Sequence, residues 1–342
     1  MKNLLHDLTI VIPTKNRPNW LKRIFQYYSE YNFTGKIIIT DSSNVETFED
    51  INRIKNIYKN LSINTYNFPN LNCESAINAI LDKIETKYSV FLADDDILLI
   101  DGLIKGVNFL NNDSTYVAAV GNAYMLGTIT NQPFGSVHSI VDYNLKSYDN
   151  ENDLKRIEDY FNDPRALSVA VISSKVFIEC YKSIMHLDKR YQTMIFGENL
   201  QAVCYLEKGK IIKLESEYLV RQFHTENLYH KIDYVGWLKN NEFRKAFNFL
   251  EKYTESTLKF KKNDQVEKIF KKYFEKIVNK APEQNNKKIL IEILKKYLPI
   301  KIIKKIKFYL YDLYKVKKFK KTVELNNYIR IIESKKFNRK LK

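Results

Sequence analysis

Three consecutive aspartates, Asp94 to Asp96, interrupt the apolar stretch "YSVFLADDDILL" (Tyr88–Leu99). Neighbouring carboxylates repel one another, and removing them from water is costly unless a positive group neutralises them. Between Tyr88 and Gly106 the chain offers only Lys105 as a basic residue. The sequence therefore favours a positive partner that is not protein, and a divalent metal ion fits that description.

Asp94 and Asp96 are the two aspartates best placed to bind such an ion. Alternate side chains of an extended segment share a face, so these two carboxylates point the same way. Carboxylate oxygens suit Mg²⁺ or Mn²⁺, whose remaining positions can take water and phosphate oxygens. A metal held there would neutralise a diphosphate and make it a better leaving group. The alternative is an acidic turn that water alone solvates.

The residues around this turn alternate between buried strands and amphipathic helices. Short apolar runs rich in β-branched residues predict strands, and apolar residues at helical spacing predict helices between them. The expected strands are Leu8–Thr14, Gly35–Asn44, Leu61–Phe68 and Tyr88–Asp96, and the expected helices are Asn19–Tyr31, Val45–Asn60 and Cys73–Ile84. This order predicts an α/β fold, Rossmann-like, with a mostly parallel sheet and helices on both faces. Ligands bind such sheets at the carboxyl ends of the strands, where three polar clusters lie: Pro13–Arg17, Asp41–Asn44 and Asp94–Asp96.

Beyond Asp96 the pattern continues and then changes. It predicts a helix at 101–112, a strand at Ser114–Leu126, loops or hairpins over Gly127–Asn150, and mixed helices and strands up to His224. From about Leu238 the strand signals end, and helical segments are expected near 240–262, 264–279, 285–297, 300–320 and 322–336. We therefore expect two domains, an α/β domain at 1–236 and a basic α-helical domain at 237–342.

Three segments, in the order "TIVIPTKNR", "KIIITDSSN" and "FLADDD", resemble the nucleotide-sugar-binding half of a GT-A-fold glycosyltransferase of family 2. The resemblance covers residues 8–110 well and 165–225 more loosely. It implies that Pro13, Thr14 and Arg17 lie around the base and ribose of the donor. Asp41 would take the position of the carboxylate that bonds the uracil ring, and Asn78 would flank the nucleotide.

The same resemblance implies that Asp94 and Asp96 form the DxD pair of the family. Asp96 would be the main ligand of Mn²⁺ or Mg²⁺, and Asp95 is expected among the donor-binding residues. The chain lacks the QxxRW-type element of processive relatives, so we expect an enzyme that adds one or few sugars.

Three downstream residues complete the expected site. The family places an acidic residue, often in a Glu-Asp pair that opens a helix, as general base; here the pair reads Glu198-Asn199, which leaves Glu198. The alternative is a glutamate that only stabilises a helix N-terminus. His224 is expected to be a third metal ligand, as in some GT-A enzymes, or else a histidine bonded to loop backbone. Arg221 is expected to hold the donor diphosphate, or else to form a surface ion pair.

The charge of the chain is strongly asymmetric. Residues 238–342 hold 31 Lys and Arg against 11 Asp and Glu, a balance of +20, whereas the whole chain carries +16. In "PIKIIKKIKFYLYDLYKVKKFKK" (Pro299–Lys321) helical spacing would give an apolar stripe bordered by lysines, which is typical of a helix on an anionic membrane surface. The alternatives are a helix packed on the catalytic domain or on a second copy of the chain. Aromatic residues between the lysines would also suit single-stranded nucleic acid, which we rank third and do not expect.

Several familiar site types are absent from the sequence. The three cysteines are far apart, which predicts neither a zinc site nor a disulfide framework, and no signal-peptide core or spanning helix is expected. There is no P-loop, no GxGxxG after the first strand and no GxSxG. We therefore expect a cytoplasmic protein, peripheral to the inner face of the cell membrane.

The function expected from these residues is sugar transfer. We expect an inverting, metal-dependent, non-processive glycosyltransferase that uses a nucleotide-diphosphate sugar, most simply a UDP-sugar. Its acceptor would be a surface glycan or a lipid-linked glycan of a capsule, lipopolysaccharide or teichoic-type polymer. The alternatives are a non-catalytic GT-A-like binding protein, which Asn199 favours, and a sugar nucleotidyltransferase, which lacks its Gly-rich basic signature here.

Overall fold

The computed structural model describes residues 2–130, 132–186, 194–224, 268–269, 272–273 and 322–334. The chain divides into two compact units, Met1–Thr225 with Lys321–Lys342, and Glu226–Lys320. The helices and strands below all belong to the first unit. The expected helices near 240–262, 285–297 and 300–320 lie outside the described residues, and so does nearly all of that near 264–279. The domain boundary near residue 236 therefore stays a prediction.

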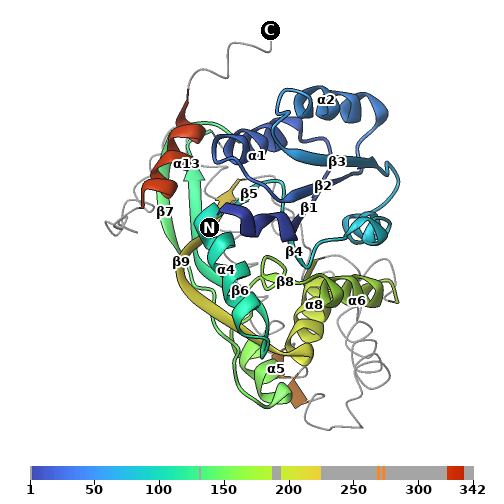
Figure 1. Ribbon diagram of the computed structural model, residues 1–342, viewed down its shortest axis with the longest axis vertical. Helices are drawn as coiled ribbons and strands as arrows, with labels where there is room; N and C mark the ends of the chain where they lie inside the picture. Colours follow the sequence, from blue (N-terminus) through green and yellow to red (C-terminus); the bar gives the residue numbers. More distant parts are fainter. Residues whose placement is uncertain are drawn as a thin grey trace, which may run out of the picture. The chain divides into compact units, whose positions relative to one another are not determined.

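The described strands form a single sheet (Figure 1). Its order is β3-β2-β1-β4-β8-β6-β9-β5, with β7 paired to β6. The bounds are β1 Leu8–Thr14, β2 Lys36–Asp41, β3 Ser62–Asn67, β4 Tyr88–Phe91, β5 Asp96–Leu98, β6 Tyr116–Thr128, β7 Val137–Tyr143, β8 Val171–Ser173 and β9 Lys210–Phe223.

The sheet is parallel in its first half and mixed in its second. Strand β1 runs parallel to β2 and β4, and β2 runs parallel to β3, as the sequence predicts. Beyond β4, strand β8 is antiparallel to both neighbours, whereas β6 and β9 are parallel. Because β1, β2 and β4 end on the same edge, the polar residues that follow them meet there.

Helices pack against this sheet and against one another. Their bounds are α1 Pro18–Glu30, α2 Val45–Lys55, α3 Cys73–Asn78, α4 Ile100–Asn112, α5 Asp153–Asn162, α6 Ser174–Ile184, α8 Met194–Lys208 and α13 Val323–Glu333, with short 3₁₀ helices at Lys2–Asp7 and Leu81–Lys83. Helix α4 lies across β6 and β9, and α3 lies against β1, β2 and α6. Helix α8 contacts α5, α6 and β6.

Local chemistry explains where several of these helices begin. Asn44, Asn72 and Asn152 each precede a helix, and the side-chain oxygen of each accepts a hydrogen bond from a first-turn backbone N–H. Such a bond satisfies one of the donors that a helix start leaves open. Helix α1 begins at Pro18, whose missing N–H costs nothing at that position.

The structure adds elements that the sequence patterns did not predict. Asp96 itself opens the short strand β5, and the expected helix Cys73–Ile84 ends at Asn78 before a separate 3₁₀ turn. The region Gly127–Asn150, expected to form loops or hairpins, contains β7, which pairs antiparallel with β6. The last stretch before His224 is one long strand, β9, rather than two. These differences depend on contacts with distant residues, which local patterns do not report.

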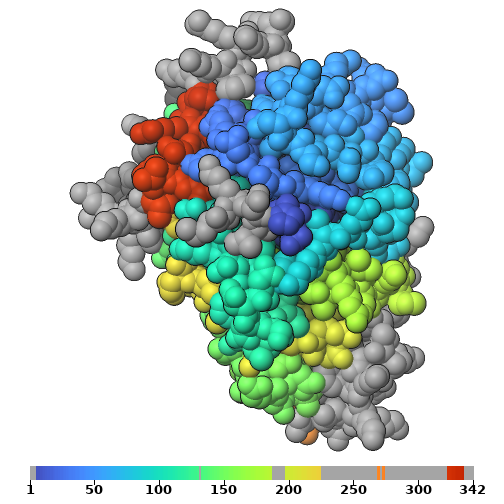
Figure 2. All heavy atoms as spheres, viewed as in Figure 1, coloured from blue at the N-terminus to red at the C-terminus, as the bar shows by residue number. Residues whose placement is uncertain are grey.

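Helix α13 confirms the helix expected near 322–336 and returns to the first unit. It contacts α1 and β7, and Figure 2 shows it (red) against blue residues of the N-terminal part. Leu325, Tyr328 and Ile332 are completely buried. None of the helices in the described ranges is both long enough and apolar enough to cross a membrane.

Candidate active site

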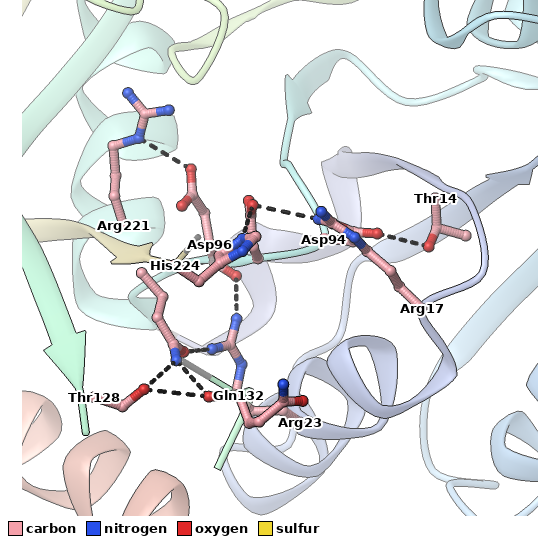
Figure 3. Close-up of polar contacts among 11 residues, drawn as sticks. Thr14, Arg17, Arg23, Asp94, Asp96, Thr128, Gln132, Arg221 and His224 are labelled. Atoms are coloured by element: carbon pink, nitrogen blue, oxygen red, sulfur yellow. Dashed lines mark hydrogen bonds and ion pairs between the residues drawn. The ribbon is translucent and has the colours of Figure 1, made fainter. Parts of the chain in front are cut away.

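The acidic turn, which we define as Asp94–Asp96, lies between β4 and β5. The Asp96 backbone N–H donates to the Ala93 carbonyl oxygen at 3.1 Å, which closes the turn. Asp96 then pairs with Arg221 of β9 in an antiparallel register. Figure 3 shows Thr14 and Arg17 reaching Asp94 from one side and Arg221 reaching Asp96 from the other.

Each carboxylate of the acidic turn has a positive or hydrogen-bonding protein partner. Asp94 accepts from Thr14 Oγ1 at 2.7 Å and from Arg17 Nη1 at 2.8 Å. Asp96 Oδ2 accepts from Arg221 Nε at 3.2 Å. The expectation that the positive partner is not protein was therefore incomplete, because these cations come from the residue before α1 and from β9, far from the turn in sequence.

His224 was expected to bind a metal ion or to bond loop backbone, and it lies beside Asp95. The Oδ2 atom of Asp95 lies 2.7 Å from His224 Nε2 and 3.4 Å from Arg17 Nη1. His224 is completely buried, and the Asp95 side chain is 13% exposed. The structure thus places His224 against the central aspartate rather than directly on Asp94 or Asp96.

The three aspartates differ in pKa because burial and neighbouring charges act on each of them to a different extent. Burial, with the negative charge of Asp95, raises the pKa of Asp94 to about 6 in spite of Arg17 and Thr14. Burial raises the pKa of Asp96 to about 7 although the positive charges of Arg221 and Arg23 oppose it. For Asp95 burial also acts upward, but the hydrogen bond and charge of His224 bring its pKa below the usual value. Burial therefore makes Asp94 and Asp96 weaker acids than free aspartates, even though Arg17 and Arg221 bond them.

The acidic turn has the donor chemistry for Mg²⁺ or Mn²⁺. Buried carboxylates with raised pKa values would be ionised by a nearby divalent cation, and hard oxygen ligands suit these ions. Yet among residues 2–130, 132–186, 194–224 and the short described segments beyond, no group of three His, Cys, Asp or Glu is arranged to hold a metal. The three aspartates are suitable metal ligands by residue type, but in this structure their carboxylates bond Arg17, Arg221 and His224.

The expected nucleotide-binding residues lie beside the acidic turn. Thr14 and Asp41 are register partners at the ends of β1 and β2, and Pro13 precedes Thr14 in β1. Asp41 is completely buried, and its Oδ1 accepts from the Ser43 backbone N–H at 2.8 Å. Its second oxygen, Oδ2, is buried with no hydrogen-bond partner. A buried carboxylate oxygen without a donor is costly, so this edge can take a ligand that donates a hydrogen bond.

Two further expected site residues, Asn78 and Glu198, belong to α3 and α8. Asn78 is the last residue of α3, which packs against β1 and β2. Glu198 is half-buried near the start of α8. Burial lowers the pKa of Arg221, but Asp96, Tyr143 and Glu198 together outweigh it and raise that pKa. Glu198 is therefore close enough to Arg221 for their charges to interact.

A second carboxyl group, Glu74, lies near Glu198. Burial raises the pKa of Glu74 to about 8, and the charge of Glu198 adds to this effect. Its Oε2 is buried without a hydrogen-bond partner. Glu74 was not among the expected site residues, and only its place in the first turn of α3 could have drawn attention to it.

Trp20, Arg23 and Gln222 were also missed by the sequence analysis. The centroid of the Trp20 ring lies 4.7 Å from the centroid of the His224 ring. The same Trp20 centroid lies 4.8 Å from Arg23 Cζ. Arg23 donates to Gln222 Oε1 and, at 3.5 Å, to the Asp96 carbonyl oxygen. The spacing of Trp20 and Arg23 on one helix face was visible in the sequence, but it did not reveal what that face contacts.

A family model described as "Glycosyl transferase family 2" matches residues 9–184, just over half of the chain. The chain belongs to glycosyl transferase family 2. The matched region contains β1 to β8 and the acidic turn. The match therefore confirms the family, the α/β fold and the enzyme class that were predicted from the sequence of this glycosyltransferase.

Known proteins are similar to this family 2 glycosyltransferase over most of its length. "GalNAc(5)-diNAcBac-PP-undecaprenol beta-1,3-glucosyltransferase" of Campylobacter jejuni is 22% identical over 302 residues, which are 86% of this chain and 89% of the relative. The crystal structure of S. aureus TarS 1-349 in complex with UDP-GlcNAc matches with a TM-score of 0.50 and 11% identity. That match covers 73% of this chain but only 66% of the TarS chain, just under two thirds.

A further solved structure is similar at a lower score. GalNAc-T7 with UDP, GalNAc and Mn²⁺ matches with a TM-score of 0.48 and 13% identity, over 83% of this chain and 58% of that one. The TarS match supports the GT-A type of fold for the enzyme described here.

Proposed function

We propose that this enzyme is an inverting, metal-dependent, non-processive transferase that moves a sugar from a nucleotide-diphosphate donor, most simply a UDP-sugar. The observation that carries the proposal is the acidic turn itself, in which Asp94 and Asp96 are buried and bonded to Arg17 and Arg221 at the carboxyl edge of the sheet. Its position next to Thr14, Arg17 and Asp41 matches where a nucleotide binds in a doubly wound fold.

Each residue in this proposal has a defined task. Asp41 Oδ2 would accept a hydrogen bond from the N–H of the base, and Thr14, Arg17, Pro13 and Asn78 would surround the nucleoside. Asp94 and Asp96 would hold Mn²⁺ or Mg²⁺, with His224 reaching the ion or fixing Asp95. The bound ion would supply charge neutralisation for the departing diphosphate. Arg221, now on Asp96, would contact the diphosphate when the ion takes its place.

Glu198 would act on the acceptor. As a carboxylate it can take the proton of the attacking hydroxyl, which inversion at the anomeric carbon requires. Its half-buried position near Arg221 supports this role, because Arg221 bonds Asp96 of the acidic turn. We further propose a glycan or lipid-linked glycan acceptor, since the Campylobacter relative's name states an undecaprenol-linked one. The enzyme would reach it from the cytoplasm, at the inner face of the membrane.

The test compares two substitutions that separate binding from turnover. Glu198→Gln should keep UDP binding with Mn²⁺ and lower the rate of sugar transfer or donor hydrolysis by at least about 100-fold, the usual worth of a general base. Asp96→Asn should lose both. Glu207→Gln, on the same helix α8 and also half-buried, is the matched control and should leave both unchanged.

The assay is UDP release from a panel of UDP-sugars. Unchanged turnover in Glu198→Gln would remove Glu198 as the base. Full activity in Asp96→Asn would contradict metal binding at the acidic turn.

One observation favours a second candidate, a non-catalytic GT-A-like binding protein. Every carboxylate of the acidic turn is already paired with a protein side chain, as it would be in a site that no longer takes metal. Such a protein would show no UDP release with any donor, while still binding its partner. The same assay therefore decides between the two candidates.

A further inference from the structure

We propose that helix α13 holds the acidic turn in place, acting through Arg23, so that Glu324, Tyr328 and Arg23 are positioning residues of the donor site. The observation is that this C-terminal helix bonds the start of α4, just after the turn, and packs on Arg23, which bonds the Asp96 carbonyl oxygen; both contacts come from more than 200 residues away in sequence. The holding itself is independent of the proposed function. Only the expected effect of α13 on binding of the sugar donor rests on the proposed function.

The first contact is made by Arg23 of α1. Arg23 is completely buried and donates to the backbone carbonyl oxygen of Asp96 at 3.5 Å, while its other terminal nitrogen donates to Gln222 Oε1. Gln222 is tied in turn to Thr128 Oγ1 at 3.2 Å and to the Gln132 carbonyl oxygen at 2.7 Å (Figure 3). Arg23 therefore connects the backbone of the acidic turn to β9 and to the end of β6.

Tyr328 of α13 lies next to Arg23. The Arg23 Cζ is 5.9 Å from the centroid of the Tyr328 ring and 4.8 Å from that of Trp20. A guanidinium buried between two aromatic faces is held by packing and by cation–π attraction. The Tyr328 hydroxyl is buried without a hydrogen-bond partner, so the ring and not the hydroxyl is what this contact uses.

Glu324 holds the other flank. Helix α4 begins four residues after Asp96, and its N-cap residue Leu99 makes no side-chain capping bond. Glu324 supplies that cap from α13: its carboxylate accepts from the Ile100 backbone N–H at 2.6 Å and from Asp101 N–H at 3.2 Å. Tyr27 of α1 also donates to it. A carboxylate at a helix N-terminus is favourable, and here it fixes the start of the helix that follows the acidic turn.

Trp20 extends the connection to the third aspartate. Its ring contacts both Arg23 and the imidazole of His224, which bonds Asp95. The carbonyl of Asp96, the side chain of Asp95 and the start of α4 are therefore all fixed to α1 or α13. Removing the α13 contacts should loosen the acidic turn before it unfolds the sheet.

Hydrogen exchange tests this directly, without any ligand. In the full-length protein, Tyr328→Leu and Glu324→Gln should each speed amide exchange at residues 96–100 by at least about tenfold, because local opening becomes easier. Exchange at Ile10–Ile12 in the central strand β1 should stay unchanged. Tyr328→Phe, which keeps the ring, and Arg330→Ala, an exposed position of α13, should both match the wild type.

The outcomes separate cleanly. Selective acceleration at residues 96–100 in Tyr328→Leu or Glu324→Gln supports the proposal, and wild-type exchange in both overturns it. If Tyr328→Leu does not fold, the milder Glu324→Gln decides. Equal acceleration at Ile10–Ile12 would also overturn it, because it would mean a general structural role.

A second measurement connects the contact to the donor site. Isothermal titration with UDP at saturating MnCl₂ should show an affinity at least about tenfold weaker in Tyr328→Leu than in Tyr328→Phe. Equal affinity in the two variants would overturn the positioning role. If the wild type itself does not bind UDP, the proposed function fails, while the exchange experiment still decides whether α13 holds the turn.

Discussion

Asp94, Asp95 and Asp96 are neighbours in sequence, but each has its own partner. Arg17 bonds Asp94, His224 bonds Asp95 and Arg221 bonds Asp96; Arg17 directly precedes α1, whereas Arg221 and His224 lie together at the end of β9. The sequence located the carboxylates correctly because a polar run after an apolar strand is a local pattern. It did not locate their partners, since Arg17 and Arg221 are brought to the turn by α1 and β9. Asp94 and Asp96 as metal ligands, and Glu198 as base, stay predictions.

Glu74 gives a prediction about pH at the residue scale. Burial raises its pKa from the usual 4.5 to about 8, so the folded protein keeps a proton that the unfolded chain releases. The stability that this carboxyl contributes is therefore complete below pH 4.5 and is lost as the pH rises through 8, by up to ~1.4 kcal/mol per pH unit. Glu74→Gln should remove this loss.

Urea unfolding of Glu74→Gln and wild type at several pH values between 5 and 8 measures the effect. The free energy of unfolding of the variant should gain on that of the wild type as the pH rises. Glu46→Gln is the matched control, because Glu46 also lies in the first turn of an Asn-capped helix but is exposed. Parallel stability curves for Glu74→Gln and wild type would contradict the buried, protonated Glu74.

At the scale of elements, α4 shows how closely a helix must approach the sheet that carries the site. A Cβ at Gly102 would lie 2.5 Å from the Glu217 carbonyl oxygen and 2.8 Å from Tyr218 Cα. Both are backbone atoms of β9, which cannot move without moving the strand. At Gly106 the nearest atom would be 3.5 Å away, an ordinary contact.

The two glycines therefore predict opposite effects of the same change. Gly102→Ala should lower the free energy of unfolding by ~1–3 kcal/mol through overpacking, and Gly106→Ala should raise it by up to ~1 kcal/mol through helix propensity. Chemical denaturation of the two variants gives both values. Equal stabilisation by the two substitutions would show that α4 is not pressed against β9 at Gly102.

The accuracy of the sequence prediction also differs among elements. Strands β1, β2 and β3 and helices α1 and α4 were predicted close to their observed positions, whereas the strand expected at Tyr88–Asp96 ends at Phe91 and the helix expected at Val45–Asn60 ends at Lys55. Strand β5 was not predicted, because three residues form a strand only when β9 lies beside them. Strand β7 lies in the region expected to form loops or hairpins, but its bounds were not predicted, because it has polar residues on its exposed face. Pairing partners, which local sequence does not contain, made the difference.

At the scale of the whole molecule, residues 226–320 are inserted into the catalytic unit. The chain leaves that unit after His224, bonded to Asp95, and returns at Thr322, whose backbone N–H lies 3.3 Å from Glu217 Oε1 of β9. The sequence analysis treated everything after residue 236 as one basic tail. Only the return of α13 to α1 reveals that the basic segment is attached to the catalytic unit at both ends.

The charge of residues 226–320 leads to a prediction about membranes. The full-length protein should co-sediment with vesicles containing anionic lipid and not with neutral ones, and binding should weaken as salt rises. Replacing Lys301, Lys304, Lys305 and Lys307 by Gln should weaken binding at least about tenfold, since each lysine near the surface contributes about 1 kcal/mol.

The matched control replaces four exposed lysines of the catalytic unit: Lys59, Lys87, Lys105 and Lys175. Binding that falls equally in both quadruple variants would indicate that only net charge matters. Binding of neither protein form to anionic vesicles would remove the membrane as a partner and leave a second copy of the chain as the alternative.

Isothermal titration of the wild-type enzyme with UDP, in MnCl₂ and then in EDTA, tests most directly whether a divalent cation joins the acidic turn to a nucleotide diphosphate. We expect UDP to bind in MnCl₂, to lose at least about tenfold in affinity in EDTA, and to show no such metal dependence in Asp96→Asn. UDP affinity that is the same in MnCl₂ and in EDTA, or an Asp96→Asn variant that keeps the full metal dependence, would contradict this account.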